Sequence, residues 1–223
     1  TALGLLLIVG VDMWDAAMDT LALVVVASVV AIVIAIPVGI WAARSARVSR
    51  VVRPILDFLQ TMPAFVYLIP AIIFFGVGAV PGMIATIMFA VAPGVRLTEL
   101  GIRGVDSEVV EAGQAFGATP ARVLRQIQIP LALLSIMAGV NQVIMLSLSM
   151  VVIAGMVGAG GLGGEIVRAI GRINVGLGFE AGISVVIIAM ILDRLTASLG
   201  TRRPARRATT DQSAHSTQME RTP

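Results

Sequence analysis

The stretch EAGQAFGATPARVLRQIQIP, residues 111–130, is polar, charged and interrupted by Gly and Pro. It lies in a chain of 223 residues that is 57% hydrophobic and only 13% charged, with a mean hydropathy of +0.97. Soluble domains carry about 25% charged residues. The composition around this stretch therefore indicates an integral membrane protein, and the stretch lies largely in a polar island, residues 96–128, outside the lipid.

Apolar runs on both sides of the island predict an all-α membrane domain with about five transmembrane helices, since a span takes about 20 apolar residues. The predicted spans are residues 20–43, 62–80, 83–95, 129–157 and 176–199. The third run is short and must extend through residues 96–100, and Pro81-Gly82 is expected to form a tight turn before it. Residues 1–11 are interpreted as the end of a truncated preceding span, and residues 12–199 as the membrane domain. Pro37, Pro70 and Pro93 are expected to kink their helices.

Arginines predict the orientation of these spans. All sixteen basic residues are Arg, and twelve of them fall into three groups, whereas Arg168 and Arg172 lie in a loop on the opposite side of the predicted spans. The groups are Arg44, Arg47, Arg50 and Arg53; Arg96, Arg103, Arg122 and Arg125; and Arg202, Arg203, Arg206 and Arg207. Five spans place all three groups on one side, which the positive-inside rule assigns to the cytoplasm, so they indicate topology rather than nucleic-acid binding. Residues 200–223 are then a disordered cytoplasmic tail.

The residue types that are missing exclude much chemistry. The chain has no Cys and no Lys, and its one histidine is His215. We therefore expect no metal site and no catalytic triad, and the protein is not expected to be an enzyme. A phosphate-binding Walker A loop needs Lys, so the sequence GAGGLGGE at residues 158–165 is not such a loop. Any ATP must be bound by a partner.

The first half of the island predicts a short capped helix and a turn. Asp106 or Ser107 can cap this helix, which continues over residues 108–116. Gly117 suits the left-handed position that ends a helix. These local signals define the start and the end of the helix.

The second half predicts another short helix. Thr119 is expected to cap it with Pro120 at its first position, and Pro130 is expected to restart the chain at the membrane. An element of this size has no core of its own, so we expect it to dock on something. An ordinary interfacial loop is the alternative.

Five positions in and beside the island resemble the cytoplasmic signature of ABC importer permeases. That signature is Glu-Ala-Ala, three residues, Gly, nine residues, Ile, one residue, and Leu-Pro. It is matched by the sequences at residues 111–112, 117, 127 and 130. Gly113 replaces the third residue of the triplet and Ile129 replaces Leu. Gly113 is expected to loosen the first helix by up to about 1 kcal/mol.

A longer resemblance covers residues 12–197. The matching segments are MWDAAMDTLALV, IPVGIWAARS, RPILDFLQTMPAFVYLIPAIIFFG, APGVRLTELGIRGV, IMAGVNQVIMLSLSMVVIAGMVGAGGLG and ILDRLT. These segments resemble the glycine betaine/proline betaine (osmoprotectant) importer permeases. The resemblance implies a type I ABC importer permease fold in the bacterial plasma (inner) membrane. It also implies a second permease chain, an ATPase subunit that binds ATP and Mg, and a binding protein that delivers solute outside.

The same resemblance implies that the island is the coupling helix that fits a groove in the ATPase. The expected coupling residues are Glu111, Ala112, Gly113, Ala115, Phe116, Gly117, Ala118, Thr119, Pro120 and Pro130. Phe116 is an apolar group on a cytoplasmic turn, which a partner groove would explain. Packing of Phe116 against the chain's own spans is the alternative.

Some aromatic and amide residues of the predicted spans are candidates for the solute pathway. A betaine cation prefers aromatic faces. Polar groups at membrane depth either bridge helices or line a pathway. The candidates are Trp41, Phe65, Tyr67, Asn141 and Gln142. Bridging is the favoured interpretation for the two amides. The Gly-rich residues 155–164 fit either a gate or close helix packing.

Two further functions remain as alternatives to betaine import. One is an ABC permease for another small solute, such as choline, carnitine or an amino acid. The other is an ATP-independent secondary transporter or channel. The scarcity of charged residues within the long spans argues against an ion-coupled carrier.

Overall fold

The computed structural model describes residues 2–200, with the side chains of residues 3–198, and every regular element in this part of the chain is a helix. The long helices are α2 (Trp14–Arg44), α5 (Ala79–Arg103), α8 (Ile129–Gly155) and α10 (Val175–Gly200). The shorter elements are α1 (Ala2–Gly10), α3 (Ala46–Thr61), α4 (Ala64–Phe75), α6 (Ser107–Ala115), α7 (Pro120–Val123), the π-helical turn η1 (Leu124–Gln128) and α9 (Gly161–Gly171). Of the predicted tail at residues 200–223, Gly200 ends α10 and residues 201–223 lie outside the described residues.

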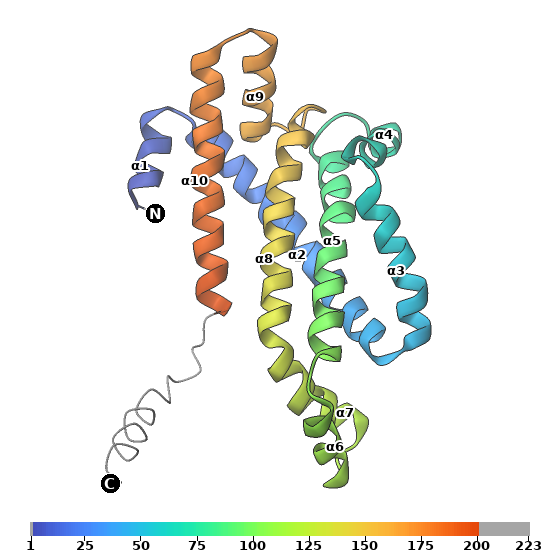
Figure 1. Cartoon of the computed structure of the whole chain (residues 1–223). Helices are drawn as coiled ribbons and strands as arrows, with labels where there is room; N and C mark the ends of the chain where they lie inside the picture. The colour runs from blue at the N-terminus through green and yellow to red at the C-terminus, as the bar shows by residue number, and fades with distance from the viewer. Residues whose placement is uncertain (1, 201–223) are drawn as a thin grey trace, which may run out of the picture.

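The helices form an elongated bundle (Figure 1). α5 and α8 lie side by side at its centre, and α2 crosses behind them. α3 flanks α5, and α10 lies on the other side of α8. α6 and α7 project from one end, called the α6 end here, and α4 and α9 lie at the opposite end, the α9 end.

Four helices in the described chain are long and apolar enough to cross a membrane, or up to five if the bent pair α3–α4 is one span. The predicted number of about five is therefore confirmed. The third span extends from Ala79 to Arg103, as its short apolar run required. The join of α2 and α3, the end of α5, and α7 with η1 all lie at the α6 end, so the first two arginine groups share one end of the bundle (Figure 1).

The predicted bounds of the second span, residues 62–80, are wrong. That stretch holds α4 and the start of α5, and only α3 and α4 together, which meet at an angle of 93°, are long and apolar enough for a span. The break follows from Pro63, because a residue before proline avoids helical geometry, and Met62 is extended with φ −74° and ψ 136°. The Tyr67 hydroxyl donates a hydrogen bond to the Leu59 carbonyl across the corner.

The predicted turn at Pro81-Gly82 is also wrong. Both residues are buried in the first turn of α5, where proline is tolerated because its missing N–H needs no partner. The chain turns earlier, at Gly76 and Gly78, which have φ of +76° and +147°. The expected kink sites at residues 37, 70 and 93 all lie within continuous helices.

Small residues allow the central helices to pack closely. A Cβ atom at Gly39 of α2 would lie 2.6 Å from the Thr98 Cβ of α5, and one at Gly101 of α5 would lie 2.6 Å from the Ser135 Cβ of α8. Close backbone approach of this kind is the usual source of helix association in membranes. The core around which the site is built is therefore the α2–α5–α8 unit.

The Gly-rich residues 155–164 favour close packing over a gate. A Cβ atom at Gly155 would lie 2.2 Å from the Gly163 carbonyl carbon, so α8 and α9 touch through their backbones. The Thr20 hydroxyl of α2 accepts a hydrogen bond from the Leu162 N–H at 2.8 Å. These contacts fix α9 onto α2 and α8.

Candidate functional site

The α6 helix begins and ends where the sequence predicted. The Asp106 side chain caps it by accepting a hydrogen bond from the Glu108 N–H at 3.0 Å. Gly117 has φ +77°, and its N–H bonds the Gln114 carbonyl at 2.8 Å. The Ala118 N–H then bonds the Gly113 carbonyl at 3.2 Å. These bonds satisfy carbonyls at the helix end and define a tight turn.

The second helix starts as predicted but continues further. Thr119 caps it by accepting a hydrogen bond from the Arg122 N–H at 3.4 Å, with Pro120 at the first position. Pro130 does not restart the chain, because α7, η1 and α8 form one helix of 36 residues, Pro120–Gly155. The Ile129 N–H reaches back to the Leu124 carbonyl, one residue further than in an α-helix. This widening accommodates Pro130, whose ring would clash with a carbonyl in a regular α-helix.

Gly113 has a packing role that its sequence position did not show. A Cβ atom there would lie 2.5 Å from the Ile127 Cδ1 and 3.7 Å from the Val123 Cγ2. Gly113 therefore lets α6 lie against α7 and η1, in addition to any loosening of the helix. The two departures from local regularity, Gly113 and the π-helical turn, lie on facing elements.

The exposure of Phe116 decides between docking on a partner and packing against the chain's own spans. Phe116 is 91% exposed, so packing of its ring against the chain's own spans is excluded. Most of the other predicted coupling residues are exposed too, namely Glu111, Ala112, Ala115, Gly117, Thr119, Pro120 and Pro130, whereas Gly113 and Ala118 are half-buried. Within residues 3–198, Glu111 forms no ion pair. The turn therefore presents an apolar ring and a free carboxylate to its surroundings.

The two amides of α8 differ in their surroundings. The Asn141 Nδ2 donates a hydrogen bond to the Asp193 Oδ1 at 3.3 Å, and the Thr196 hydroxyl donates to the Asn141 Oδ1 at 2.6 Å. Asn141 therefore bridges α8 and α10, which was the favoured interpretation. Gln142 is exposed on the next face of α8.

The three predicted aromatic residues do not form one site. Tyr67 is buried and lines an apolar pocket of about 320 Å³ with Phe58, Phe74 and residues of α5. Trp41 and Phe65 are exposed and are not among the lining residues of that pocket. The structure therefore brings together a different aromatic set from the predicted one.

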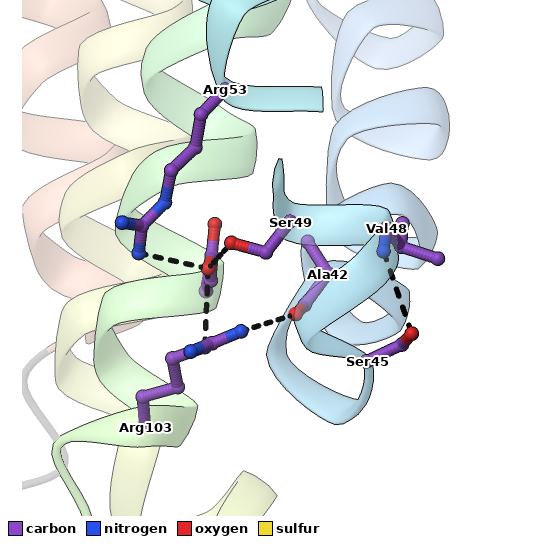
Figure 2. A network of polar contacts seen from close by, with 7 residues as sticks. Ala42, Ser45, Val48, Ser49, Arg53 and Arg103 are labelled. Carbon is purple, nitrogen blue, oxygen red and sulfur yellow. Dashed lines mark hydrogen bonds and ion pairs between the residues drawn. The ribbon is translucent and has the colours of Figure 1, made fainter. Parts of the chain in front are cut away.

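A buried carboxylate at the α6 end was missed entirely. Glu99 of α5 is 3% exposed, and its Oε1 accepts hydrogen bonds from the Ser49 hydroxyl at 2.7 Å and from the Arg53 Nη2 at 3.0 Å. The Arg103 Nε lies 3.1 Å from the same oxygen, and the Arg103 Nη2 donates to the Ala42 carbonyl at 2.9 Å. Figure 2 shows Ser49, Arg53 and Arg103 converging from α3 and α5 on one oxygen, with Arg103 also bonded to Ala42 of α2. The i, i+4 spacing of Glu99 and Arg103 was the only local signal.

A second ion pair joins the same two helices on the surface. Arg96 of α5 contacts Asp57 of α3, and both side chains are substantially exposed. Together with Glu99 and its two arginines, this pair lines a pocket of about 310 Å³ between α3 and α5. The α6 end thus holds one buried charge cluster and one exposed pair.

The chain can now be compared with known proteins. Residues 35–203, more than half of the chain, match the family of binding-protein-dependent transport system inner membrane components. The chain belongs to this family of transport permeases. The permease is 50% identical over 206 residues to the glycine betaine transport system permease protein OpuAB of Bacillus subtilis, covering 92% of this chain and 73% of that protein.

Other relatives agree with this match. The permease is 56% identical over 193 residues to the glycine betaine/carnitine transport permease protein GbuB of Listeria monocytogenes, covering 86% of this chain and 68% of that protein. It is 52% identical over 200 residues to the glycine betaine/proline betaine transport system permease protein ProW of Escherichia coli, covering 90% of this chain and 56% of that protein. The family resemblance found in the sequence motifs is confirmed.

Solved structures show the same fold. The permease superposes on a chain of the inward-facing MetNI methionine ABC transporter with a TM-score of 0.77 and 22% identity, covering 84% of this chain and 94% of that one. An amino acid ABC transporter with histidines matches with a TM-score of 0.64 and 19% identity, covering 87% of this chain and 95% of that one. The predicted type I ABC importer permease fold is confirmed.

Proposed function

We propose that this permease is the membrane-spanning subunit of an ATP-driven importer for glycine betaine or a related quaternary-amine osmoprotectant, located in the bacterial plasma (inner) membrane. The observation that carries the proposal is the identity of 50% and 56% to two glycine betaine permeases over 92% and 86% of this chain. The permease itself performs no covalent chemistry.

In this proposal the α6–α7 segment is the coupling helix, on the cytoplasmic side together with the C-terminus. Its partner is an ATPase subunit that binds ATP and Mg, and a groove of that subunit receives the turn around Phe116. The 91% exposure of Phe116 and the capped, hydrogen-bonded turn support this role. ATP binding would favour one of two permease conformations through the contacts that differ between them.

The two connections of the segment suggest how its movement would reach the spans. On one side, α7 continues through η1 into α8 without a break in the helix. On the other side, residues 104–106 separate α6 from α5. When the turn is displaced, α7, η1 and α8 would therefore move together as one rigid helix, while the link to α5 bends.

The remaining partners follow from the same proposal. A second permease chain completes the pathway, and a substrate-binding protein or domain delivers solute from outside. The family description, binding-protein-dependent transport, supports this assembly. Names of the relatives extend the candidate solutes to carnitine and trimethylamine N-oxide, the latter at 42% identity.

Reconstitution tests the proposed function. The permease is placed in lipid vesicles with its ATPase and binding protein, and uptake of radiolabelled glycine betaine is followed with and without ATP. We expect uptake that requires ATP and the binding protein, with competition by carnitine or trimethylamine N-oxide ranking the related solutes. Uptake by the permease alone, without the ATPase, would instead indicate a secondary transporter or channel.

A further inference from the structure

We propose that Glu99 is a positioning residue that locks α3 to α5 at the root of the coupling segment, so that movement of α5 is passed on to the bent pair α3–α4. This inference rests on the proposed function. Glu99 lies four residues before Arg103, the last residue of α5, and α6 begins at Ser107. A displacement that α7 and η1 pass to α8 reaches α5 through the close contact of Gly101 with Ser135, two residues from Glu99.

The contacts of Glu99 join α3 to α5 through one atom, and Arg103 connects this cluster to α2. Its Oε1 accepts from Ser49 and Arg53 of α3 and from Arg103 of α5. Arg103 also donates to the Ala42 carbonyl near the end of α2. Because the bonds from Ser49 and Arg53 of α3 both end on the Glu99 Oε1 of α5, α3 cannot slide along α5 without breaking both of them (Figure 2).

The rest of the α3 interface is thin. Within α3, only Ser49 and Leu56 are buried, and Leu56 packs with residues of α2 and α5. By contrast, α5 is held against α2 and α8 by backbone-to-backbone approach at Gly39 and Gly101. The Glu99 cluster is therefore a large part of what attaches α3 to the central unit.

Burial makes the cluster specific for one geometry. A buried ion pair contributes little net stability, because desolvation offsets the Coulomb attraction, but breaking it leaves an uncompensated charge. Glu99 is 3% exposed, whereas Arg53 remains 58% exposed in its side chain. The arrangement of α3 and α5 that keeps Glu99 paired is thus strongly preferred over displaced ones.

Arg53→Gln is the main test variant. It removes the guanidinium that links α3 to Glu99, while Arg103 still neutralises Glu99 within α5. Asp57→Asn is the matched control, because it breaks the exposed ion pair between the same two helices. Glu99→Gln, which keeps the size of the side chain and loses the charge, is the second variant.

The measurement uses the complete transporter in vesicles, with solute uptake and ATP hydrolysis followed on the same sample. In Arg53→Gln and Glu99→Gln we expect the amount of solute moved per ATP to fall at least about fivefold. Assembly and basal ATP hydrolysis should stay unchanged, and Asp57→Asn should match the wild type. An unchanged ratio in Arg53→Gln, or an equal loss in Asp57→Asn, overturns the inference.

A distance measurement supplies a readout that a loss of stability would not imitate. Spin labels at Val51 of α3 and Leu100 of α5, which are 63% and 65% exposed, report the separation of the two helices. We expect one narrow distance in wild type with and without ATP, and a broader or nucleotide-dependent one in Arg53→Gln. If wild type shows no ATP-driven uptake, the proposed function fails; if uptake is normal and the distances coincide, only the role of Glu99 fails.

Discussion

The connections between long helices at the two ends of the bundle differ in how far they are buried. At the α6 end, α6 and α7 join α5 to α8, and no residue of α6 is buried. At the α9 end, α9 joins α8 to α10, and Gly161, Leu162 and Gly163 are buried against α2 and α8. Both connections are short helical segments. The difference shows that α9 is held by contacts within the bundle, whereas the exposed α6 is consistent with its proposed role in docking on a partner.

The largest expected effect is at the α6 end and tests docking of the exposed turn. Phe116→Asp should abolish ATP-driven uptake, because a charge replaces the apolar ring proposed to enter the ATPase groove. The permease should still insert and fold, since the ring is 91% exposed. The measurements are uptake in vesicles and copurification of the ATPase.

A matched control lies at the other end. Ile170 of α9 is 72% exposed, and Ile170→Asp should leave ATPase binding intact. Normal uptake in Phe116→Asp with the ATPase still bound would remove the proposed docking role. Loss of ATPase binding in both variants would show that the effect is not specific to the α6 end.

The next effect is at the α9 end and tests the close packing of α8 against α9. Gly155→Ala should lower the thermal stability of the purified permease, because its Cβ would lie 2.2 Å from the Gly163 carbonyl carbon. Overpacking typically costs about 1–3 kcal/mol, and contact with backbone leaves little room to relax. Gly164→Ala is the control, since nothing lies within 4 Å of its Cβ. Equal melting temperatures for Gly155→Ala and wild type would contradict the close-packed joint.

A smaller effect is expected inside the coupling segment. Gly113→Ala gains about 1 kcal/mol of helix propensity. It also places a Cβ 2.5 Å from the Ile127 Cδ1, so α6 or the Ile127 side chain must move. We expect a partial loss of uptake, and recovery in the double variant Gly113→Ala with Ile127→Val, which lacks that Cδ1. Full uptake in the single variant would mean that rigidity of α6 alone matters.

The smallest effect concerns the hydrogen bonds by which Asn141 bridges α8 and α10. Asn141→Ala should destabilise the contact of α8 with α10 by about 0.6–1.7 kcal/mol, as measured for hydrogen bonds between membrane helices. Uptake should persist, and Gln142→Ala, at an exposed position, should change neither property. If Asn141→Ala stops uptake at unchanged stability, Asn141 belongs to the pathway instead.

Local signals in the sequence predicted a large part of the fold and of the candidate site. The caps at Asp106 and Thr119 and the turn at Gly117 are hydrogen bonds between near neighbours, so their residues alone specify them. The apolar runs likewise specify the spans. Pro63 also carried a local signal for the break between α3 and α4, which the apolarity of residues 62–80 obscured.

The sequence by itself thus determined the membrane class, the family and the capped turn that carries Phe116. Only the tertiary structure decided which distant side chains meet. Glu99 lies 50 residues from Ser49 and 46 from Arg53 in the chain, and Gly113 needs its small size only because Ile127 packs against it. The physical reason is the range of the contacts. A cap forms its hydrogen bonds within one turn of helix, whereas the partners of a buried charge, and the need for a residue without a Cβ, depend on which helix face packs against it.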